Sequence, residues 1–142
     1  MKIGIDCIGI YVVGVCHDGQ GNVLYMRRSE KARDEHNRWN AGAGGTLEMG
    51  ETLESCLHRE VLEETGAQIS EVEYIGHREI LREKDSVTSH WIGHYFKVLV
   101  NRDSVSLMED VHDAILWQSF HEMPVPMISK YDETYETFKK YF

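Results

Sequence analysis

Residues 45–67 read GTLEMGETLESCLHREVLEETGA, and this stretch decides the fold. From Thr52 to Thr65 it contains neither Gly nor Pro, so an uninterrupted helix is expected. Thr52 can cap the amino end of this helix, and Gly66 stands where helices commonly end in the left-handed conformation. The sequence therefore predicts a glycine-rich turn followed by one helix.

The carboxylates of this helix are predicted to face the protein interior. At about 100° per residue, the apolar side chains gather on one stripe, made of Leu53, Cys56, Leu57 and Val61. Glu60 and Glu64 fall within about 20° of Leu53 in azimuth. The glutamates of a helix ordinarily form its solvated face, which lies opposite the apolar stripe. Glu60 and Glu64 instead continue the apolar stripe. An unpaired carboxylate turned inward costs several kcal/mol unless it is protonated or coordinated, which favours a divalent cation here.

The spacing of the charged residues resembles the signature of the Nudix hydrolases, also called the MutT family. The pattern is Gly45, five residues, Glu51, seven residues, then Arg59-Glu60-Val61, one residue, Glu63-Glu64, one residue and Gly66. The only departure inside the signature is Ala67, which replaces a larger aliphatic residue. Just upstream of the signature, Ala43 precedes Gly44-Gly45 where a proline is common. The resemblance implies an α/β/α sandwich with a mixed β-sheet, in which the signature forms a loop, a helix and a loop.

Hydrolysis of a diphosphate needs cations that neutralise the phosphates and acidify the attacking water. Glu60 and Glu64 are expected to bind Mg²⁺, or Mn²⁺ in its place, with one or two ions per site. Glu63 is expected to be a further ligand or a catalytic carboxylate that orients a metal-bound water. By resemblance, the backbone carbonyl of Gly44 is another ligand.

The remaining signature residues are expected to support this site. Arg59 can pair with Glu63, and by resemblance it orients the signature glutamates. Glu51 is expected to stabilise the loop and the helix start through Arg59, with Gly45 and Gly66 as structural positions of the same loops. The general base stays open, because in the family it comes from the signature helix or from a later loop. Glu63 is the candidate within the signature helix, and the candidates on a later loop are Glu109 and Asp110. The alternative interpretation of Glu109 and Asp110 is that they belong to an ordinary solvated loop without a catalytic role.

Substrate contacts are expected from cationic side chains ahead of the glycine turn, namely Arg27, Arg28, Arg33 and Arg38. Arg27 and Arg28 would point to opposite faces at the end of a strand, so at most one of them is expected in the site. The tryptophans, which could stack on a base or pack in the core, are Trp39, Trp91 and Trp117.

Composition limits the partners. The 142 residues predict a single domain, 1–142. Fifteen basic and 24 acidic residues give a net charge of −9, which disfavours nucleic acid polymers and acidic membranes as partners. The absence of a signal peptide or an apolar span predicts a cytoplasmic protein, and the three cysteines are interpreted as reduced core thiols: Cys7, Cys16 and Cys56. The family resemblance also allows a homodimer.

The rest of the chain predicts strands and one further helix around the signature. A hairpin is expected from strands at 8–15 and 23–26, followed by a polar loop at 29–38. Further predicted elements are strands at 72–81, 90–100 and 114–118, a charged loop at 82–89, and a carboxy-terminal helix at 129–142 with aromatic residues at helical spacing. These elements favour a mixed sheet covered by helices.

The expected function is metal-dependent cleavage of the pyrophosphate in a nucleoside diphosphate that is linked to another group. The short chain resembles the nucleoside triphosphate pyrophosphohydrolases of the family, with an ADP-ribose or nucleotide-sugar pyrophosphatase as the alternative. Three other readings carry less weight. An isopentenyl diphosphate isomerase needs a catalytic Cys that cannot be placed here. A nucleotide-sensing module commonly has a damaged signature, and a structural protein would not turn Glu60 and Glu64 inward.

Overall fold

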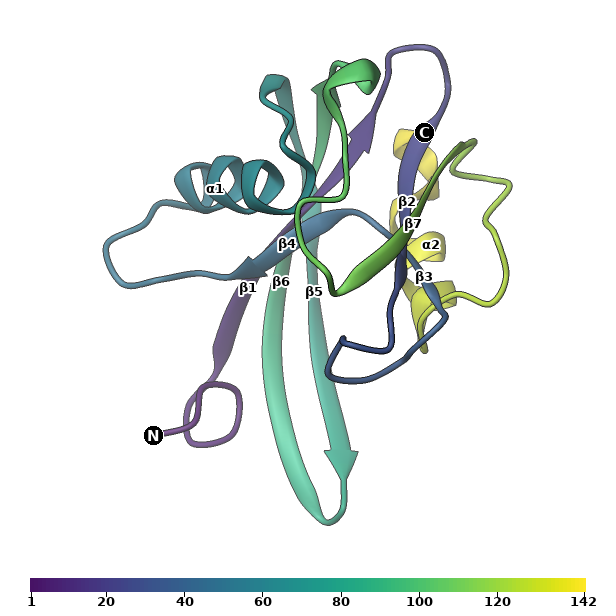
Figure 1. Ribbon diagram of the computed structural model, residues 1–142. Helices are drawn as coiled ribbons and strands as arrows, with labels where there is room; N and C mark the ends of the chain where they lie inside the picture. Colours follow the sequence, from purple (N-terminus) through teal and green to yellow (C-terminus); the bar gives the residue numbers. More distant parts are fainter.

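The computed structural model describes all of residues 1–142 as seven strands and two α-helices (Figure 1). In chain order the elements are β1 (Gly9–His17), β2 (Val23–Arg28), β3 (Trp39–Ala41), β4 (Ala43–Thr46), α1 (Leu53–Thr65), β5 (Ile69–Lys84), β6 (Val87–Val100), β7 (His112–Gln118) and α2 (Tyr131–Phe138). Two short 3₁₀ turns, η1 (Arg102–Ser104) and η2 (Lys139–Tyr141), complete them. No helix in the structure is both long and apolar enough to span a bilayer.

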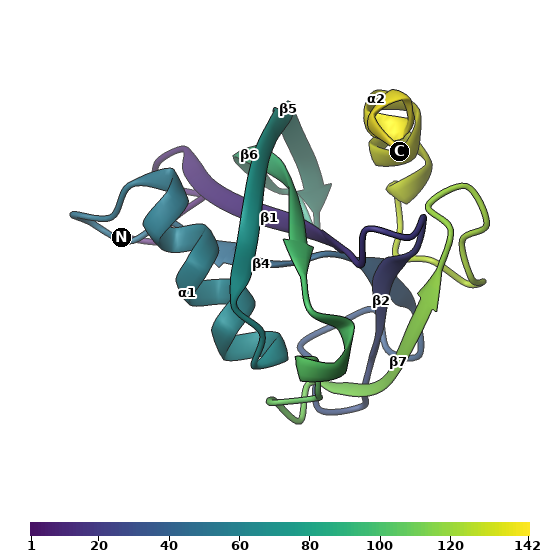
Figure 2. The same cartoon turned by 90° about the horizontal axis from the view of Figure 1, so that it is seen from above.

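The strands form one mixed sheet in the order β3-β2-β1-β6-β5, with β4 paired to β1 and β7 paired to β2. Strands β1 and β6 run parallel, whereas the other named pairs are antiparallel. The sheet is strongly curled, and α1 and α2 lie on different sides of it (Figure 2). The predicted α/β architecture with a mixed sheet is confirmed.

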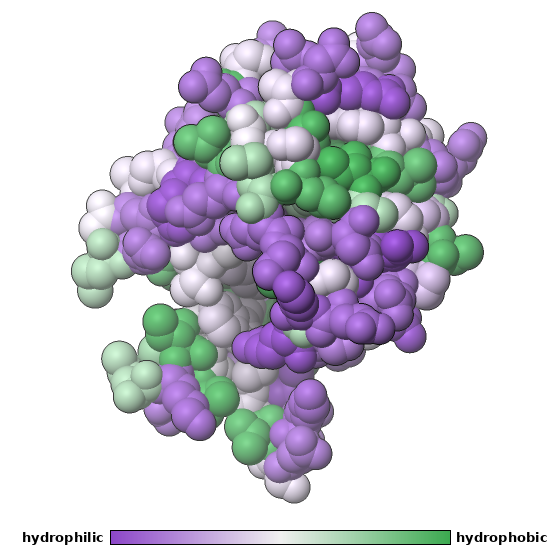
Figure 3. All heavy atoms as spheres, viewed as in Figure 1, coloured by the Kyte–Doolittle hydropathy of each residue, from purple (hydrophilic) through white to green (hydrophobic).

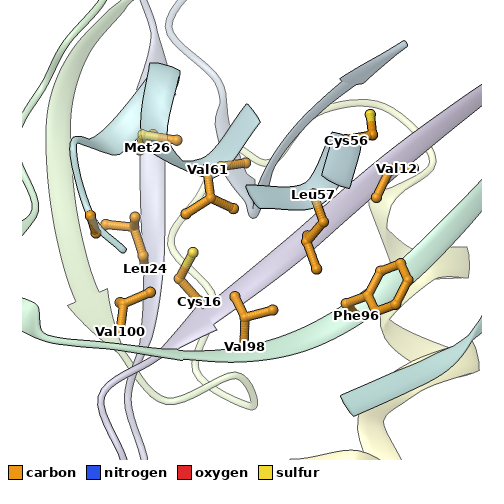
Figure 4. Close-up of a cluster of buried hydrophobic side chains, with 12 residues drawn as sticks. Val12, Cys16, Leu24, Met26, Cys56, Leu57, Val61, Phe96, Val98 and Val100 are labelled. Atoms are coloured by element: carbon orange, nitrogen blue, oxygen red, sulfur yellow. The ribbon is translucent and has the colours of Figure 1, made fainter. Parts of the chain in front are cut away.

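Two hydrophobic cores hold the helices to the sheet. Alternate residues of β1 separate them: Val12 and Cys16 belong to the core under α1, and Val15 to the core under α2. Figure 4 shows the first core, in which Leu57 and Val61 descend from α1 toward the strands. The second core is rich in aromatic residues contributed by β2, β6, α2 and the segment after β7.

Gly14 of β1 is what lets α1 approach the sheet so closely. A Cβ atom at this position would come within 2.8 Å of Leu57 Cδ1 and 3.2 Å of Val61 Cγ2. Any larger residue would therefore push the helix outward, together with the carboxylates on it.

The signature helix has the predicted ends. The Thr52 hydroxyl accepts a hydrogen bond from the Ser55 amide at 3.1 Å, and the Ser55 hydroxyl accepts one from the Thr52 amide at 2.9 Å. This reciprocal cap satisfies two amides that the helix leaves unpaired. At the other end Gly66 adopts φ 73°, the left-handed conformation that was predicted from its position.

The predicted charged loop at 82–89 is wrong. In the structure β5 continues to Lys84 and β6 begins at Val87, so the two strands form one long hairpin that projects from the body (Figure 1). Asp85 and Ser86, with φ of 52° and 64°, make the two-residue turn. The loop was predicted from the charged residues of this segment. A hairpin that is exposed on both faces can, however, carry charged residues and still form its ladder of backbone hydrogen bonds.

The polar loop at 29–38 and the hairpin of β1 and β2 are confirmed, whereas the short strands β3 and β4 were not predicted. The prediction for Cys7 is wrong, because this thiol is exposed in the amino-terminal turn, while Cys16 and Cys56 are buried as expected.

Candidate active site

Helix α1 turns its glutamates toward β4. The Glu60 side chain is only 13% exposed, and its carboxylate lies directly over Gly45, where a Cβ atom would collide with it. Glu64, one turn further along, faces a cleft together with Gly44 and Gly45. The inward azimuth predicted for these two carboxylates is therefore confirmed, and the glycine turn provides the space they occupy.

Arg59 organises the acidic residues around it. Its guanidinium donates from Nε and Nη2 to the Glu51 carboxylate at 2.7 and 2.8 Å. From Nη1 it donates to Glu60 at 2.8 Å and to Glu63 at 3.3 Å. The predicted pairings of Arg59 with Glu63 and Glu51 are both present. One cation thus holds three carboxylates, and none of its bonds goes to Glu64.

The site carries more negative charge than Arg59 offsets. Burial first, and then the charges of Glu60 and Glu109, raise the pKa of Glu64 to about 8, although the hydrogen bond from the Gly44 amide opposes this shift. Burial also raises the pKa of Glu60 despite its bond to Arg59. By contrast, the hydrogen bonds from Arg59 and from the Glu48 amide lower the pKa of Glu51 to about 2. The two inward carboxylates are therefore the ones that lack a sufficient countercharge.

These donors fit a hard divalent cation. Mg²⁺ and Mn²⁺ prefer carboxylate and carbonyl oxygens, which Glu60, Glu63, Glu64 and the backbone of Gly44 supply. Extra positive charge would also relieve the raised pKa values of Glu60 and Glu64. In the structure no three acidic, histidine or cysteine side chains are grouped as metal ligands, and Arg59 donates hydrogen bonds to Glu60 and Glu63.

The segment after η1 brings a further carboxylate to this site. The amides of Ser106 and Met108 donate to the last carbonyls of α1, on Thr65 and Glu64, at 2.9 and 3.4 Å. Glu109 follows directly, and its charge raises the pKa of both Glu60 and Glu64, so it lies within electrostatic range of them.

Asp110 points elsewhere. Its carboxylate lies 3.4 Å from the Lys31 ammonium, and both side chains are largely exposed. Of the two distal candidates for the general base, Glu109 is therefore the one near the signature carboxylates.

A cleft of about 800 Å³ extends from Glu64 and the glycine turn to the end of the β5–β6 hairpin. Figure 3 looks onto the molecule from the side on which the surface is hollowed between the amino-terminal turn and the rest of the body. The aromatic residues that line the cleft are Tyr11, Trp91, Tyr95 and Tyr131. Among the three tryptophans only Trp91 lines it.

The arginines predicted as substrate contacts divide between the cleft and the surface. Arg28 and Arg33 line the cleft. Arg27 instead pairs with Asp113 at 2.8 Å, as expected if neighbouring strand residues point to opposite faces. Arg38 donates to the Met127 carbonyl at 3.0 Å and does not line the cleft.

The sequence reasoning missed several polar residues of the cleft, which are Arg78, Arg82, Lys84, His112 and Tyr131. The alternation of basic residues at positions 78, 82 and 84 could have indicated a shared face once the strand was extended. The Tyr131 hydroxyl and the His112 Nδ1 atom are buried and have no hydrogen-bond partner, and no sequence pattern signals this.

Comparison with known proteins gives one family. The NUDIX domain family model matches residues 8–140. Among curated proteins, the NAD-capped RNA hydrolase NudC of Pasteurella multocida (strain Pm70) is 49% identical over 58 residues, which are 38% of this chain and 22% of that protein. NudC of Vibrio atlanticus (strain LGP32) is 59% identical over 32 residues, 22% of this chain and 12% of that protein. The chain thus spans less than a quarter of these relatives.

Solved structures show the same fold over nearly the whole chain. A MutT protein from Methanosarcina mazei Go1 superimposes with a TM-score of 0.75 and 25% identity, covering 94% of each chain. A MutT NUDIX hydrolase from Burkholderia pseudomallei has a TM-score of 0.75 at 19% identity and covers 92% of this chain and 97% of its own. The NUDIX domain of Shewanella oneidensis NrtR, complexed with ADP ribose, has a TM-score of 0.70 at 16% identity and covers 99% and 90%.

Proposed function

The chain belongs to the Nudix family, and we propose that it is a divalent-metal-dependent hydrolase that cleaves the pyrophosphate of a nucleoside diphosphate linked to another group. One observation carries this proposal. Glu60 and Glu64 are turned inward with raised pKa values, and Glu64 lines a cleft of about 800 Å³. Such a site attracts a cation, and a cation attracts a diphosphate.

Bound Mg²⁺ or Mn²⁺ would neutralise the phosphate oxygens and lower the pKa of the attacking water. We assign the metal-binding oxygens to Glu60, Glu63, Glu64 and the Gly44 carbonyl. Arg59 fixes the positions of Glu60 and Glu63, because the bidentate bond to Glu51 leaves its third nitrogen pointing at them. Arg28 and Arg33 line the same cleft and can contact the phosphates.

The proton of the attacking water needs an acceptor. Glu63 and Glu109 are both candidates, since Glu63 belongs to the Arg59 group and Glu109 acts electrostatically on Glu60 and Glu64. We favour Glu109, because the Glu63 carboxylate already accepts a hydrogen bond from Arg59.

The relatives support the broad class of substrate. NAD and ADP ribose, which appear in the names of the NudC proteins and of the NrtR structure, each contain a nucleoside diphosphate linked to a second group. The short chain predicts a nucleoside triphosphate as the substrate, and this prediction competes with the dinucleotide and ADP-ribose alternatives.

Release of phosphate, pyrophosphate and nucleoside monophosphate tests the proposal. The panel contains nucleoside triphosphates, ADP-ribose, nucleotide sugars, NAD⁺ and dinucleoside polyphosphates, each with Mg²⁺ and then with EDTA. The proposal predicts turnover that EDTA abolishes, in at least one of these groups. Nucleotide binding without any turnover would instead favour a sensing module.

A further inference from the structure

The cleft collects positive charge in a protein that is otherwise acidic. The chain has a net charge of −9, yet six basic residues and only two acidic ones line the cleft. The basic residues are Arg28, Arg33, Arg78, Arg82, Lys84 and Lys130, and the acidic ones are Asp34 and Glu64. A concave surface with this excess of cations attracts a ligand with several negative charges.

Three of the cations stand in one row on the hairpin. Arg78, Arg82 and Lys84 line the cleft from β5, whereas Leu81 and Glu83 between them do not. Residues at even spacing share one face of a strand, so this face of the arm is directed toward the cleft. On the same face of the partner strand, Gly93 lies opposite Arg78 and Ser89 lies opposite Arg82.

The outer two cations of this row have no countercharge in the protein. Arg78 is held by Glu133 at 2.7 Å and by the Thr134 hydroxyl. Arg82 and Lys84, in contrast, take part in none of the ion pairs or side-chain hydrogen bonds of the structure, which leaves their charge free for a ligand.

The hairpin cations, Arg82 and Lys84, are too far from the signature to bind the same diphosphate. In the sheet Gly44 pairs with Val13, and Val13 with Tyr95. From Tyr95 to Ser89, the partner of Arg82, β6 advances six residues, which corresponds to about 20 Å of strand. A ligand that reaches both ends must therefore be an extended molecule.

The surface between the two ends suits a nucleoside. Tyr11 and Tyr95 join their hydroxyls at 2.9 Å, and the Tyr11 ring packs edge-on against Trp91 at 6.3 Å between centroids. Flat aromatic surface with polar tips can hold a base and a sugar without adding charge. Along the cleft, an aromatic surface therefore lies between the charged residues at the Glu64 end and the hairpin cations at the other end.

We propose that Arg82 and Lys84 form a second phosphate-binding site, and that the substrate carries a phosphate on the far side of a nucleoside from the scissile pyrophosphate. This inference rests on the proposed function, because it takes the Glu64 end of the cleft as the place of hydrolysis. Two sources share this chemistry: a dinucleotide with a phosphorylated ribose, and the 5′ end of a short oligonucleotide whose phosphodiester follows the nucleoside.

Binding without metal tests the second site independently of hydrolysis. Three probes are titrated by calorimetry in EDTA: NAD⁺, NADP⁺ with its additional ribose phosphate, and a dinucleotide RNA that begins with NAD. The wild-type protein is expected to bind one of the two phosphorylated probes about tenfold more tightly than NAD⁺. This preference should shrink as the salt concentration rises from about 0.05 to about 0.5 M, because salt screens the attraction between the phosphate and the two cations. The probe that is preferred identifies the source of the phosphate.

The variant Arg82→Ala/Lys84→Ala is expected to bind all three probes with similar affinity. Arg102→Ala/Lys140→Ala, which removes two positive charges outside the cleft, is the matched control and should retain the preference. Thermal melts confirm that both variants fold. Equal affinity of the wild-type protein for all three probes would overturn the second site, as would a preference that survives in Arg82→Ala/Lys84→Ala. Failure of the proposed hydrolase function would be recognised by a different result, the absence of turnover with Mg²⁺.

Discussion

Both oxygens of the Glu51 carboxylate accept hydrogen bonds from Arg59, at 2.7 Å from its Nε atom and 2.8 Å from its Nη2 atom. Glu51 lies in the loop before α1, and Arg59 lies in the middle of that helix. The pair therefore fixes the loop to the helix and leaves Nη1 of Arg59 directed at Glu60 and Glu63. Glu51 is therefore expected to act on the site through Arg59, without contact with metal or substrate.

Glu51→Gln is expected to lower turnover about tenfold, since an amide cannot accept both hydrogen bonds and outer partners of metal ligands commonly matter by this amount. It should also lower the melting temperature at neutral pH. The pKa of Glu51 is lowered to about 2, so the stabilisation by the pair is complete above its ordinary pKa and is lost as pH falls toward 2.

Thermal melts from pH 3 to pH 7 check this relationship. The difference in melting temperature between wild type and Glu51→Gln should shrink as the solution becomes more acidic. Glu48→Gln is the matched control in the same loop, because Glu48 lies 3.9 Å from Arg59 and its side chain is 68% exposed. A difference that stays constant over this pH range would contradict the pairing.

Glu64 predicts the opposite pH dependence in the metal-free protein. Its pKa rises from an ordinary value of 4.5 to about 8 on folding, so the folded state binds the proton more tightly. The contribution of Glu64 to stability is therefore highest below pH 4.5 and falls as pH rises toward 8. Relative to Glu64→Gln, the free energy of unfolding should fall by at most about 1.4 kcal/mol per pH unit.

Urea denaturation in EDTA at pH 5, 6, 7 and 8 measures this difference. Glu60 and all other titrating groups are common to wild type and Glu64→Gln, so subtraction isolates Glu64 to a first approximation. Parallel stability profiles of the two proteins would show that Glu64 is not forced toward its neutral form. Saturating Mg²⁺ should flatten the wild-type profile, because a bound cation favours the ionised carboxylate.

The signature helix could be predicted from local information alone. Its cap at Thr52, its end at Gly66 and the direction of Glu60 and Glu64 follow from residue type and a period of 3.6, and the structure agrees with them. The pairing of Arg59 with Glu63 was predictable for the same reason, since one helical turn separates them.

Contacts between distant segments could not be predicted in this way. The approach of Glu109 to α1 depends on how the chain after β6 crosses the end of that helix. The hairpin cations became part of the cleft only because β5 and β6 continue through a charged segment, and charge patterning argued for a loop there. Burial of the Tyr131 hydroxyl without a partner depends on packing from several elements.

Tyr131→Phe separates ligand binding from stability. Tyr131 lines the cleft and is 3% exposed, and its buried hydroxyl has no hydrogen-bond partner. Removing an unsatisfied buried hydroxyl should leave the ligand-free stability unchanged or raise it by up to about 1 kcal/mol. Nucleotide binding should weaken about threefold to tenfold, because a substrate group is expected to satisfy this hydroxyl.

The matched control is Tyr25→Phe. The Tyr25 hydroxyl donates to the Ser119 carbonyl at 3.0 Å, so its removal should cost about 1 kcal/mol of stability. Melting temperatures with and without nucleotide distinguish the two variants. Equal destabilisation by both substitutions would mean that Tyr131 already has a partner in solution.

The turn of the long hairpin offers a stabilising change. Asp85 and Ser86 both adopt positive φ, which suits Asn followed by Gly better than the residues present. Relief of this left-handed conformation should therefore let Asp85→Asn/Ser86→Gly raise the free energy of unfolding by about 0.5 to 1 kcal/mol. Urea denaturation at pH 7 measures the change, and unchanged or lower stability would contradict the turn geometry.

The most direct test of the metal-dependent hydrolase compares Glu64→Gln with Glu54→Gln at saturating Mg²⁺. Both substitutions remove one carboxylate from α1, but Glu54 is exposed in the first turn and Glu64 faces the cleft. With the substrate identified by the panel, kcat/KM of folded Glu64→Gln should fall by at least about 100-fold, while Glu54→Gln stays within about twofold of wild type. Near-normal turnover by Glu64→Gln would contradict the metal-binding role on which the proposed function depends.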